Sequence, residues 1–425
     1  MAGNWKRVAV SEVCELIVDC VNKTAPVVEE LTPYKMLRTT NIKGGRIDRE
    51  ECRRVSKETF VKWTRRADVK HGDVILTREA PLGEVGYVDF TDSVFLGQRL
   101  MQYRANRAHL EPRFLLYSFL SKDLQNQFGA HEGSGSTVSH IRVGDCSKFQ
   151  LSLPPLAEQK AIAAVLGALD DKIESNRRMN ATLEAMARAL FQSWFVDFDP
   201  VRAKLDGREP TGLDPGTAAL FPEHMKDSPM GYIPDGWTAG NLRDIGENSR
   251  RGIQPSGIPP NTPYIALEHM PRRSIALGDW DDAADVASGK SAFKKGEILF
   301  GKLRPYFHKV GVAPFDGVCS TDILVLAPKS PEWFGFLLGH ASSDELIQFS
   351  DLASTGTKMP RTNWKDISSF KVALPPKPIA AAFTSKVQPM LDRIHANLHQ
   401  SRALATLRHT LLPKLLSGEL GTVII

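Results

Sequence analysis

The residue groups that could support catalysis are few, and each lacks a part that the chemistry requires. A phosphate-binding loop follows the spacing GxxxxGK[ST], because its glycines let backbone N–H groups surround the phosphates. Gly289–Ser291 supply the end of that pattern, but Ala284 stands where the first glycine is needed. Glu158–Lys160 and Asp170–Lys172 could mimic the acidic-x-Lys end of a nuclease site, yet both fall on a predicted helix without an acidic partner on a strand. We therefore expect no catalytic residues in this chain.

Metal and cofactor sites are not expected either. The 11 histidines form no pair at metal-ligand spacing on a helix, and the chain has neither a glycine fingerprint after a strand nor the Asn-Pro-Pro-aromatic tetrad of amino-methyltransferases. The cysteines show no CxxC pair and leave one over, which argues against a zinc site and a disulfide framework. We expect all five to be reduced and structural: Cys14, Cys20, Cys52, Cys146 and Cys319.

Composition and charge suggest a globular protein with a basic segment in its first half. A chain of 425 residues is too long for a single ordinary hydrophobic core. It is 42% hydrophobic and 24% charged, and it has no apolar run long enough to span a bilayer. The opening MAGNWKRVAV has no apolar signal core, so we expect a cytoplasmic protein without a membrane partner. Between Lys35 and Arg78 there are 13 Lys and Arg against 6 Asp and Glu, which a basic binding surface or a solvated charged face would explain equally well.

An internal repeat defines the architecture. Lys70–Arg78 (KHGDVILTR) matches Lys294–Lys302 (KKGEILFGK), and each reads as a turn glycine followed by an apolar strand with a basic end. Gly133–Pro155 matches Ala353–Pro376, and in both copies a Pro-Pro pair leads into a long helix. We predict a first domain over 1–153, a first long helix over 154–196, an irregular connector over 197–237, a second domain over 238–374, and a second long helix with a tail over 375–425.

Both helices carry a heptad seam. It runs from Ile162 to Trp194 and, 221 residues later, from Phe383 to Leu415. Asn176 and Asn397 are the midpoints of their helices, so an antiparallel pair in symmetric register would bring the two amides together. Alternatively, each helix packs on its own domain and the asparagines face solvent. The predicted helix-pairing residues are Leu169, Ile173, Asn176, Leu183, Met390, Ile394, Asn397 and Leu404.

Two prolines should disturb the second helix. Pro389 removes a backbone hydrogen bond and clashes with the preceding turn, at a cost of ~3 kcal/mol, so a kink or a late start is expected there. Pro413 should bend or end the helix before Gly418. The fold class that we predict is α+β, with two mixed α/β domains joined by two long helices in an antiparallel coiled coil with a pseudo two-fold repeat.

Two domains on a rod ~58 Å long suggest the recognition of two separated parts of one extended ligand. Duplex DNA fits, because major grooves on one face recur every ~34 to 36 Å, and Arg, Lys, Ser, Thr and His can contact phosphates or base edges. The flanking loops differ between the two domains, which indicates two different half-sites. The candidate DNA-binding residues are Arg38, Lys43, Arg78, Arg99, Ser136, Thr137, His140, Arg142, Lys302, Arg304, Tyr306, Thr355, Lys358 and Arg361.

Three stretches resemble the conserved regions of the specificity subunit of type I restriction-modification systems. They are Leu153–Asn176 (LPPLAEQKAIAAVLGALDDKIESN), Trp194–Lys204 (WFVDFDPVRAK) and Leu411–Leu420 (LLPKLLSGEL). The resemblance implies a non-catalytic subunit whose two target recognition domains each read half of a bipartite, asymmetric DNA sequence. It also implies that the helices set the spacing and dock two modification (methyltransferase) subunits. S-adenosylmethionine would bind to those subunits, and ATP and Mg to the restriction (translocase/endonuclease) subunits that join them.

The second helix departs from the family pattern, with Lys377–Phe383 (KPIAAAF) where the first has LAEQKAI, so its docking surface need not be equivalent. Two other functions remain open from the residues alone. One is a structural adaptor that pairs proteins through its helices, and the other is a fused single-chain methyltransferase or nuclease.

Overall fold

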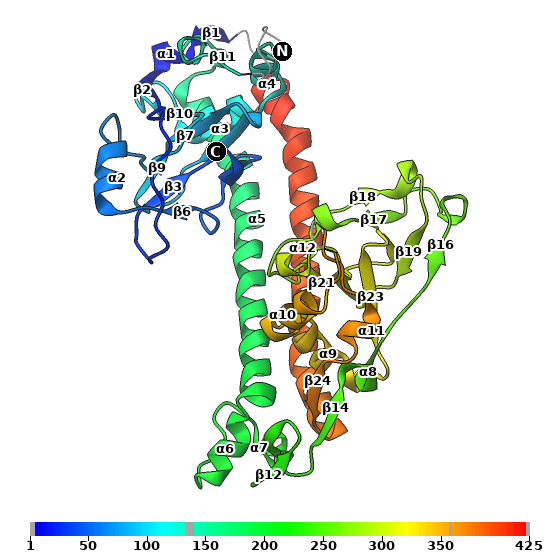
Figure 1. The fold of residues 1–425 in the computed structure, drawn as a ribbon. Coiled ribbons are helices and arrows are strands. Elements are labelled where there is room, and N and C mark those ends of the chain that lie inside the picture. Colours follow the sequence, from blue (N-terminus) through cyan, green and yellow to red (C-terminus); the bar gives the residue numbers. More distant parts are fainter. Residues whose placement is uncertain (1–4, 132–139, 357–358, 422–425) are drawn as a thin grey trace. The chain divides into compact units, whose positions relative to one another are not determined.

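Two compact units make up the protein in the computed structural model, which describes residues 5–131, 140–356 and 359–421 (Figure 1). Unit 1 comprises Met1–Lys172 and Leu404–Ile425, and unit 2 comprises Ile173–Ala403. Each unit contains one α/β domain and a share of the two long helices, α5 (Leu156–Phe191) and α12 (Lys377–Leu416).

The domain of unit 1 is built on a four-stranded antiparallel sheet and a smaller three-stranded sheet. The four-stranded sheet has the order β2 (Cys14–Asp19), β10 (Leu100–Ala105), β7 (Val74–Arg78) and β8 (Leu82–Tyr87). The three-stranded sheet has the order β6 (Arg53–Arg54), β3 (Lys35–Leu37) and β9 (Val94–Leu96), with β3 parallel to β9. Two further pairs are β1 (Lys6–Ala9) with β11 (Gln150–Leu153) and β4 (Ile42–Lys43) with β5 (Arg46–Ile47). The helices are α1 (Val10–Val13), α2 (Lys57–Trp63), α3 (Pro112–Leu120), α4 (Lys122–Gly129), η1 (Thr39–Asn41) and η2 (Val143–Asp145).

The domain of unit 2 follows the same plan. Its four-stranded antiparallel sheet has the order β15 (Gly246–Asn248), β23 (Ile323–Pro328), β20 (Ile298–Gly301) and β21 (Val310–Val312). Its second sheet has the order β16 (Gly252–Ile253), β19 (Lys290–Phe293), β22 (Gly317–Cys319), β17 (Pro263–Ile265) and β18 (Asp281–Asp282). A further pair joins β14 (Thr238–Asn241) to β24 (Lys371–Leu374). The helices are α8 (Leu242–Ile245), α9 (Phe334–Ala341), α10 (Asp344–Leu352), α11 (Trp364–Ile367), η4 (Pro255–Gly257), η5 (Leu267–His269), η6 (Ala283–Asp285), η7 (Pro305–Phe307) and η8 (Pro331–Trp333).

The two domains repeat one topology. The order β2-β10-β7-β8 in unit 1 corresponds to β15-β23-β20-β21 in unit 2. The parallel pair of β3 with β9 corresponds to the parallel pair of β17 with β22. The matched strand sequences therefore occupy the same places in both sheets, and the predicted α+β repeat is confirmed.

The long helices run antiparallel. In unit 2, Asn176 Nδ2 donates to Gln400 Oε1 over 2.9 Å and to Ser401 Oγ over 3.2 Å, whereas Phe191, later on α5, meets the earlier Phe383 with ring centroids 6.1 Å apart. Unit 1 shows the same direction, since Asp170 pairs with Arg408 over 2.6 Å. The predicted antiparallel direction is therefore confirmed.

The two central asparagines are buried, with 0% of Asn176 and 1% of Asn397 exposed, so the alternative in which they face solvent is wrong. Their amides do not bond to each other, however. Asn397 Nδ2 donates to Asn180 Oδ1 over 2.8 Å, and Asn176 binds Ser401 in the same way. The repeat interval of 221 residues relates Asn176 to Asn397 and Asn180 to Ser401, so the pairs Asn176–Ser401 and Asn397–Asn180 are equivalent and the core of the coil has pseudo two-fold symmetry.

The other predicted helix-pairing residues are less uniform. Ile394 is 1% exposed, whereas Leu169, Ile173, Leu183, Met390 and Leu404 are half-buried. Leu391, beside Met390, is 2% exposed and packs in the core instead.

Helix α12 is unbroken from Lys377 to Leu416, so the expected late start at Pro389 and the expected end at Pro413 are wrong. Both prolines are exposed, while Leu391 and Leu415 are buried. The apolar side chains therefore keep their packing on one face, and this packing offsets the hydrogen bond that each proline ring removes.

The connector over 197–237 is more ordered than an irregular segment. It contains α6 (Asp199–Leu205), α7 (Pro215–Ala219) and a hairpin of β12 (Met225–Ser228) with β13 (Gly231–Pro234), and it follows a π-helical turn, η3 (Gln192–Val196). Pro200 and Pro215 occupy the first turns of the short helices, where a missing N–H is harmless. Proline in this segment thus starts helices.

We expect Gly339→Ala to destabilise unit 2 by about 1 to 3 kcal/mol. A Cβ at Gly339 of α9 would lie 2.0 Å from the Phe191 ring of α5, so the two helices would have to separate. The free energy of unfolding in urea, followed by circular dichroism, measures the effect. Gly129→Ala is the matched control, since nothing lies within 4 Å of a Cβ there, and a loss no larger than in this control would contradict the packing.

We expect His340→Phe to reduce the loss of stability in acid. Burial among Phe191, Phe336 and Phe370 lowers the pKa of His340 from 6.5 to about 3. Between those pH values the unfolded chain binds this proton and the folded chain does not, so the histidine destabilises the fold as pH falls. Urea unfolding at about pH 7 and about pH 5 measures the difference. Exposed His224→Phe is the control, and an equal acid loss in both variants would contradict the assignment.

Candidate nucleic-acid interface

In unit 1 the basic loop residues gather around the end of β7. Ile141 N donates to Arg78 O over 2.9 Å, Arg78 N donates to Arg99 O over 2.8 Å, and Arg78 Nη1 donates to Ile141 O over 3.1 Å. Gly97 N donates to Leu37 O over 2.7 Å, which brings Arg38 and Arg99 toward the same edge. Three chain segments that are far apart in sequence thus present arginines at one place.

Local bonds orient two of these arginines. The Arg38 backbone N donates to Asn41 Oδ1 over 2.9 Å, and its Nη2 donates to Glu51 O over 3.2 Å. Arg99 has a left-handed backbone with φ 71° and an ion pair with Glu79 over 2.7 Å. A left-handed backbone conformation is unusual for a residue other than glycine. Here this conformation directs the half-exposed Arg99 side chain outward.

The remaining candidates of unit 1 are more dispersed. Lys43 is exposed on β4, which pairs with β5 and packs near β8. Arg142 is exposed at the start of η2, directly after Ile141, and His140 directly precedes Ile141. Ser136 and Thr137 lie outside the described residues. The structure thus brings Arg38, Arg78, Arg99, His140 and Arg142 to one edge and leaves Lys43 on a neighbouring strand.

Unit 2 builds the same backbone frame with other side chains. Thr362 N donates to Lys302 O over 3.0 Å, and Lys302 N donates to Asp322 O over 2.9 Å. Lys302 therefore stands where unit 1 has Arg78, and Asp322 stands where unit 1 has Arg99. At one equivalent position the charge is reversed.

Other contacts complete this cluster in unit 2. Thr355 and Arg361 exchange two backbone hydrogen bonds of 3.0 Å, and Arg304 N donates to Pro360 O over 2.8 Å. Asp322 also pairs with Arg361 Nε over 3.3 Å. Tyr306 is 51% exposed on η7, and Lys358 lies outside the described residues. Lys302, Arg304, Tyr306, Thr355 and Arg361 thus lie on adjoining loops.

A hollow of about 510 Å³ beside Lys302 holds further polar side chains that the sequence did not single out. They come from three places in the chain: Asn248, Arg250, Ser291, Asn363 and Lys365. Asn363 and Lys365 fall inside the repeated stretch Ala353–Pro376, although nothing in the repeat marked them as surface contacts. Asn248 and Arg250 precede the repeated motifs, and β15 brings them to the hollow only through its pairing with β23.

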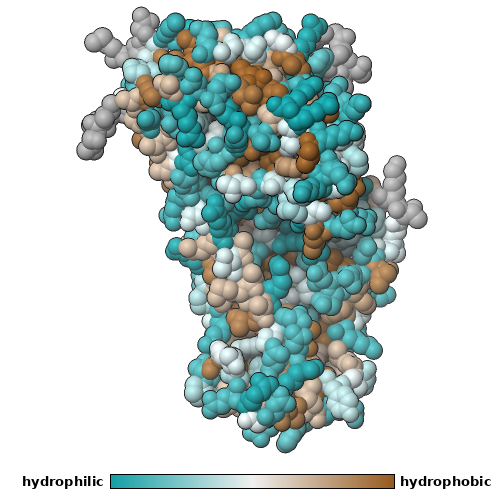
Figure 2. Space-filling model, turned by 90° about the vertical axis from the view of Figure 1, so that its left-hand side faces the viewer, coloured by the Kyte–Doolittle hydropathy of each residue, from teal (hydrophilic) through white to brown (hydrophobic). Residues whose placement is uncertain are grey.

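Within the described ranges, no three His, Cys, Asp or Glu side chains gather as metal ligands would. In the same ranges, no helix is both long and apolar enough to cross a membrane. The face shown in Figure 2 is mostly hydrophilic, with apolar residues in small groups among charged ones. This face therefore favours binding through hydrophilic side chains.

Comparisons with known proteins agree with this geometry. Residues 2–185 match the family model described as type I restriction modification DNA specificity domain. The specificity subunit of the type I restriction enzyme HindI from Haemophilus influenzae is 26% identical over 403 residues, covering 83% of this chain and 87% of that protein. The MjaIX specificity subunit from Methanocaldococcus jannaschii is 25% identical over 362 residues, covering 82% and 78%. The fold is similar to the crystal structure of the S subunit from M. genitalium, with a TM-score of 0.53 and 16% identity over 97% of this chain and 96% of that one.

The duplicated α/β domain, the antiparallel helices and the basic loops define a two-domain specificity protein. Residues 2–185 thus match the DNA specificity domain of type I restriction-modification systems, and the chain is similar over most of its length to the specificity subunits of such systems. The similar proteins are named specificity subunits, in agreement with the non-catalytic role that the sequence predicted.

Proposed function

We propose that each domain reads one half of a bipartite, asymmetric target in duplex DNA. The observation that carries this proposal is the shared backbone frame with divergent side chains, in which Arg78 and Arg99 of unit 1 are replaced by Lys302 and Asp322 in unit 2. Two identical half-sites would need identical groups on the frame. Two different sets of groups suit two different half-sites.

The side chains on the frame match the groups that DNA offers. An arginine can bind O6 and N7 of guanine together, and a lysine can bind either a guanine edge or a phosphate. A carboxylate can accept a hydrogen bond from cytosine N4, so Asp322 would favour a base that Arg99 would reject. Arg250 and Lys365, in the hollow beside Lys302, would add phosphate contacts that fix the register without reading sequence.

The paired helices would set the distance between the half-sites and recruit the catalytic partners. At ~1.5 Å per residue, helices of 36 and 40 residues are longer than the ~34 to 36 Å between successive major grooves on one face of DNA. Val165, Met186 and Leu407 are apolar yet 42%, 48% and 45% exposed on these helices. They would help to dock two modification subunits carrying S-adenosylmethionine, to which restriction subunits using ATP and Mg would bind.

We expect Arg78→Ala and Lys302→Ala to have reciprocal effects on specificity. Each change removes one donor from one domain, so each should relax discrimination at one half-site by about 10-fold and leave the other unchanged. Methylation by the complex with its modification subunits, on duplexes with single base changes in either half-site, measures both ratios. Equal effects on both half-sites would contradict the assignment of one domain to one half-site. DNA binding that does not weaken as salt rises would favour the adaptor instead.

We expect seven residues inserted after Ser175 and seven after Ala403 to lengthen the unread gap by about 3 base pairs. One heptad adds ~10.5 Å to each helix and preserves the seam, while both segments that contact the domains stay intact. Sequencing of methylated sites in DNA modified by the complex gives the gap length. An unchanged gap would show that something other than the helices sets it.

A further inference from the structure

A buried carboxylate joins helix α5 to the domain of unit 2. Glu184 is 7% exposed, Ser274 Oγ donates to its Oε1 over 2.8 Å, and the Ile275 backbone N donates to its Oε2 over 3.1 Å. Burial raises the pKa of Glu184, and these two hydrogen bonds oppose that shift. Because the two oxygens bind adjacent residues, the carboxylate fixes both the position and the direction of that segment.

The segment held by Glu184 is bonded in turn to a candidate DNA-binding loop. Arg273 N donates to His308 O over 2.9 Å, and the Arg272 guanidinium lies 4.3 Å from the centre of the Phe307 ring. His308 directly follows η7, the short helix that carries Tyr306, and Arg304 directly precedes it. Four consecutive residues, Arg272 to Ile275, therefore connect α5 with the loop after β20.

This connection includes unusual backbone geometry. Arg273 has φ 56° and His308 has φ 50°, both in the left-handed region, which costs a non-glycine residue ~1 kcal/mol or more. Such conformations persist only where surrounding contacts hold them. Asp344 supplies one, an ion pair of 2.9 Å with Arg273 Nη1, and Ser342 O supplies another by accepting a hydrogen bond from His308 Nε2 over 3.0 Å.

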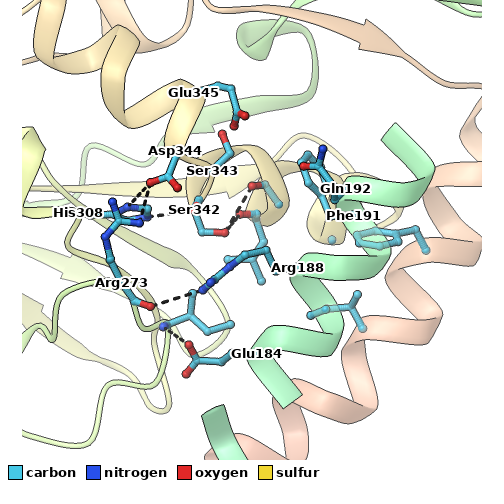
Figure 3. Close-up of a pocket in the computed structure, with 17 residues that line it drawn as sticks. Glu184, Arg188, Phe191, Gln192, Arg273, His308, Ser342, Ser343, Asp344 and Glu345 are labelled. Atoms are coloured by element: carbon cyan, nitrogen blue, oxygen red, sulfur yellow. Dashed lines mark hydrogen bonds and ion pairs between the residues drawn. The ribbon is translucent and has the colours of Figure 1, made fainter. Parts of the chain in front are cut away.

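Figure 3 shows how these groups meet. Glu184 and Arg188 extend from α5 toward Arg273, and His308 and Asp344 lie beyond it, around a pocket of about 130 Å³. Ala187 and Phe191 of α5 and Ile275 of the segment also line this pocket, so apolar packing and the hydrogen bonds of Glu184 together hold the segment against α5. A further packing contact between α5 and the domain lies two helical turns along α5, where the rings of Phe191 and His340 have centres 4.9 Å apart.

We propose that Glu184 is a positioning residue that holds the recognition loop Lys302–His308 in register for the second half-site. This inference rests on the proposed function. A buried charge is usually no more stabilising than a well-packed apolar residue, so retention of a carboxylate here is better explained by the geometry that it imposes. The repeat places Ala405 at the equivalent position of α12, so a carboxylate contact of this kind is specific to the second domain.

The test measures specificity for each half-site in the complete complex with modification subunits. For Glu184→Ala we expect the preference for the correct second half-site over a single-base variant to fall about 10-fold, which is the size of one wrong base pair. The preference at the first half-site should stay unchanged. Glu184→Gln keeps one acceptor oxygen and should fall in between.

A merely structural role would lower the amount of active complex and leave both preferences unchanged. Ser274→Ala removes one of the two hydrogen bonds to Glu184 and disturbs the fold much less. It therefore provides the test if Glu184→Ala does not fold. We expect it to lower the preference for the correct second half-site by a smaller factor and to leave the first half-site preference unchanged. Glu345→Gln is the matched control, because it removes another carboxylate at the same pocket from an exposed position on α10.

Unchanged second half-site preference in folded Glu184→Ala, or in Ser274→Ala if the former does not fold, would overturn the inference. That outcome leaves the proposed function intact as long as Arg78→Ala and Lys302→Ala still separate the two half-sites. If those two variants do not separate them, the proposed function itself is wrong.

Discussion

The structure depends on the pairing of two long apolar seams around a polar centre. Neither α5 nor α12 could remain helical in water with its stripe exposed, since most helical stability comes from packing of the apolar face. Asn176 and Asn397 restrict that packing to one register, because a shift along the seam would place a buried amide against apolar side chains without a partner. Direction and register of the helices thus follow from a few hydrogen bonds in the coil.

In each domain, the groups that hold the loops in place differ from the groups that are available for recognition. The bonds that the two domains share at these loops run between backbone atoms, as in Ile141 N to Arg78 O and Thr362 N to Lys302 O, so they do not depend on which side chains the loops carry. Side chains at the same frame positions can therefore change from arginine to aspartate while the fold is kept. This separation is what a protein needs if its two halves are to recognise different partners on one scaffold.

Periodicity and internal repetition made the long helices, the repeated sheets and the buried asparagines predictable, because these features recur at fixed spacing. Features that depend on contacts distant in sequence were not predictable. Glu184 sits beside the predicted seam residue Leu183, yet it turns to the domain, and nothing in its neighbours indicates Ser274 as its partner. The late start expected at Pro389 is wrong for a related reason, since the local cost of the proline was weighed without the packing of Leu391. For the candidate site, the repeated strands located the loops, but Arg250 and Lys365 reach the hollow only through the sheet and α11.

The domain of unit 2 also meets α12, and part of this contact is aromatic stacking. The Arg402 guanidinium lies 3.9 Å from the centre of the Trp280 ring, and that ring packs on Phe315 with centres 4.5 Å apart. Stacking of this kind tolerates sliding and rotation, because it has little directional preference within the ring plane. Two hydrogen bonds to a buried carboxylate do not tolerate such movement. Helix α12 supplies directional bonds as well, because Thr384 Oγ1 accepts from Gly335 N over 3.0 Å and donates to Glu332 O over 2.8 Å. The contacts at Glu184 and at Thr384 therefore fix the orientation of the domain from both helices, and the aromatic contact adds to its attachment.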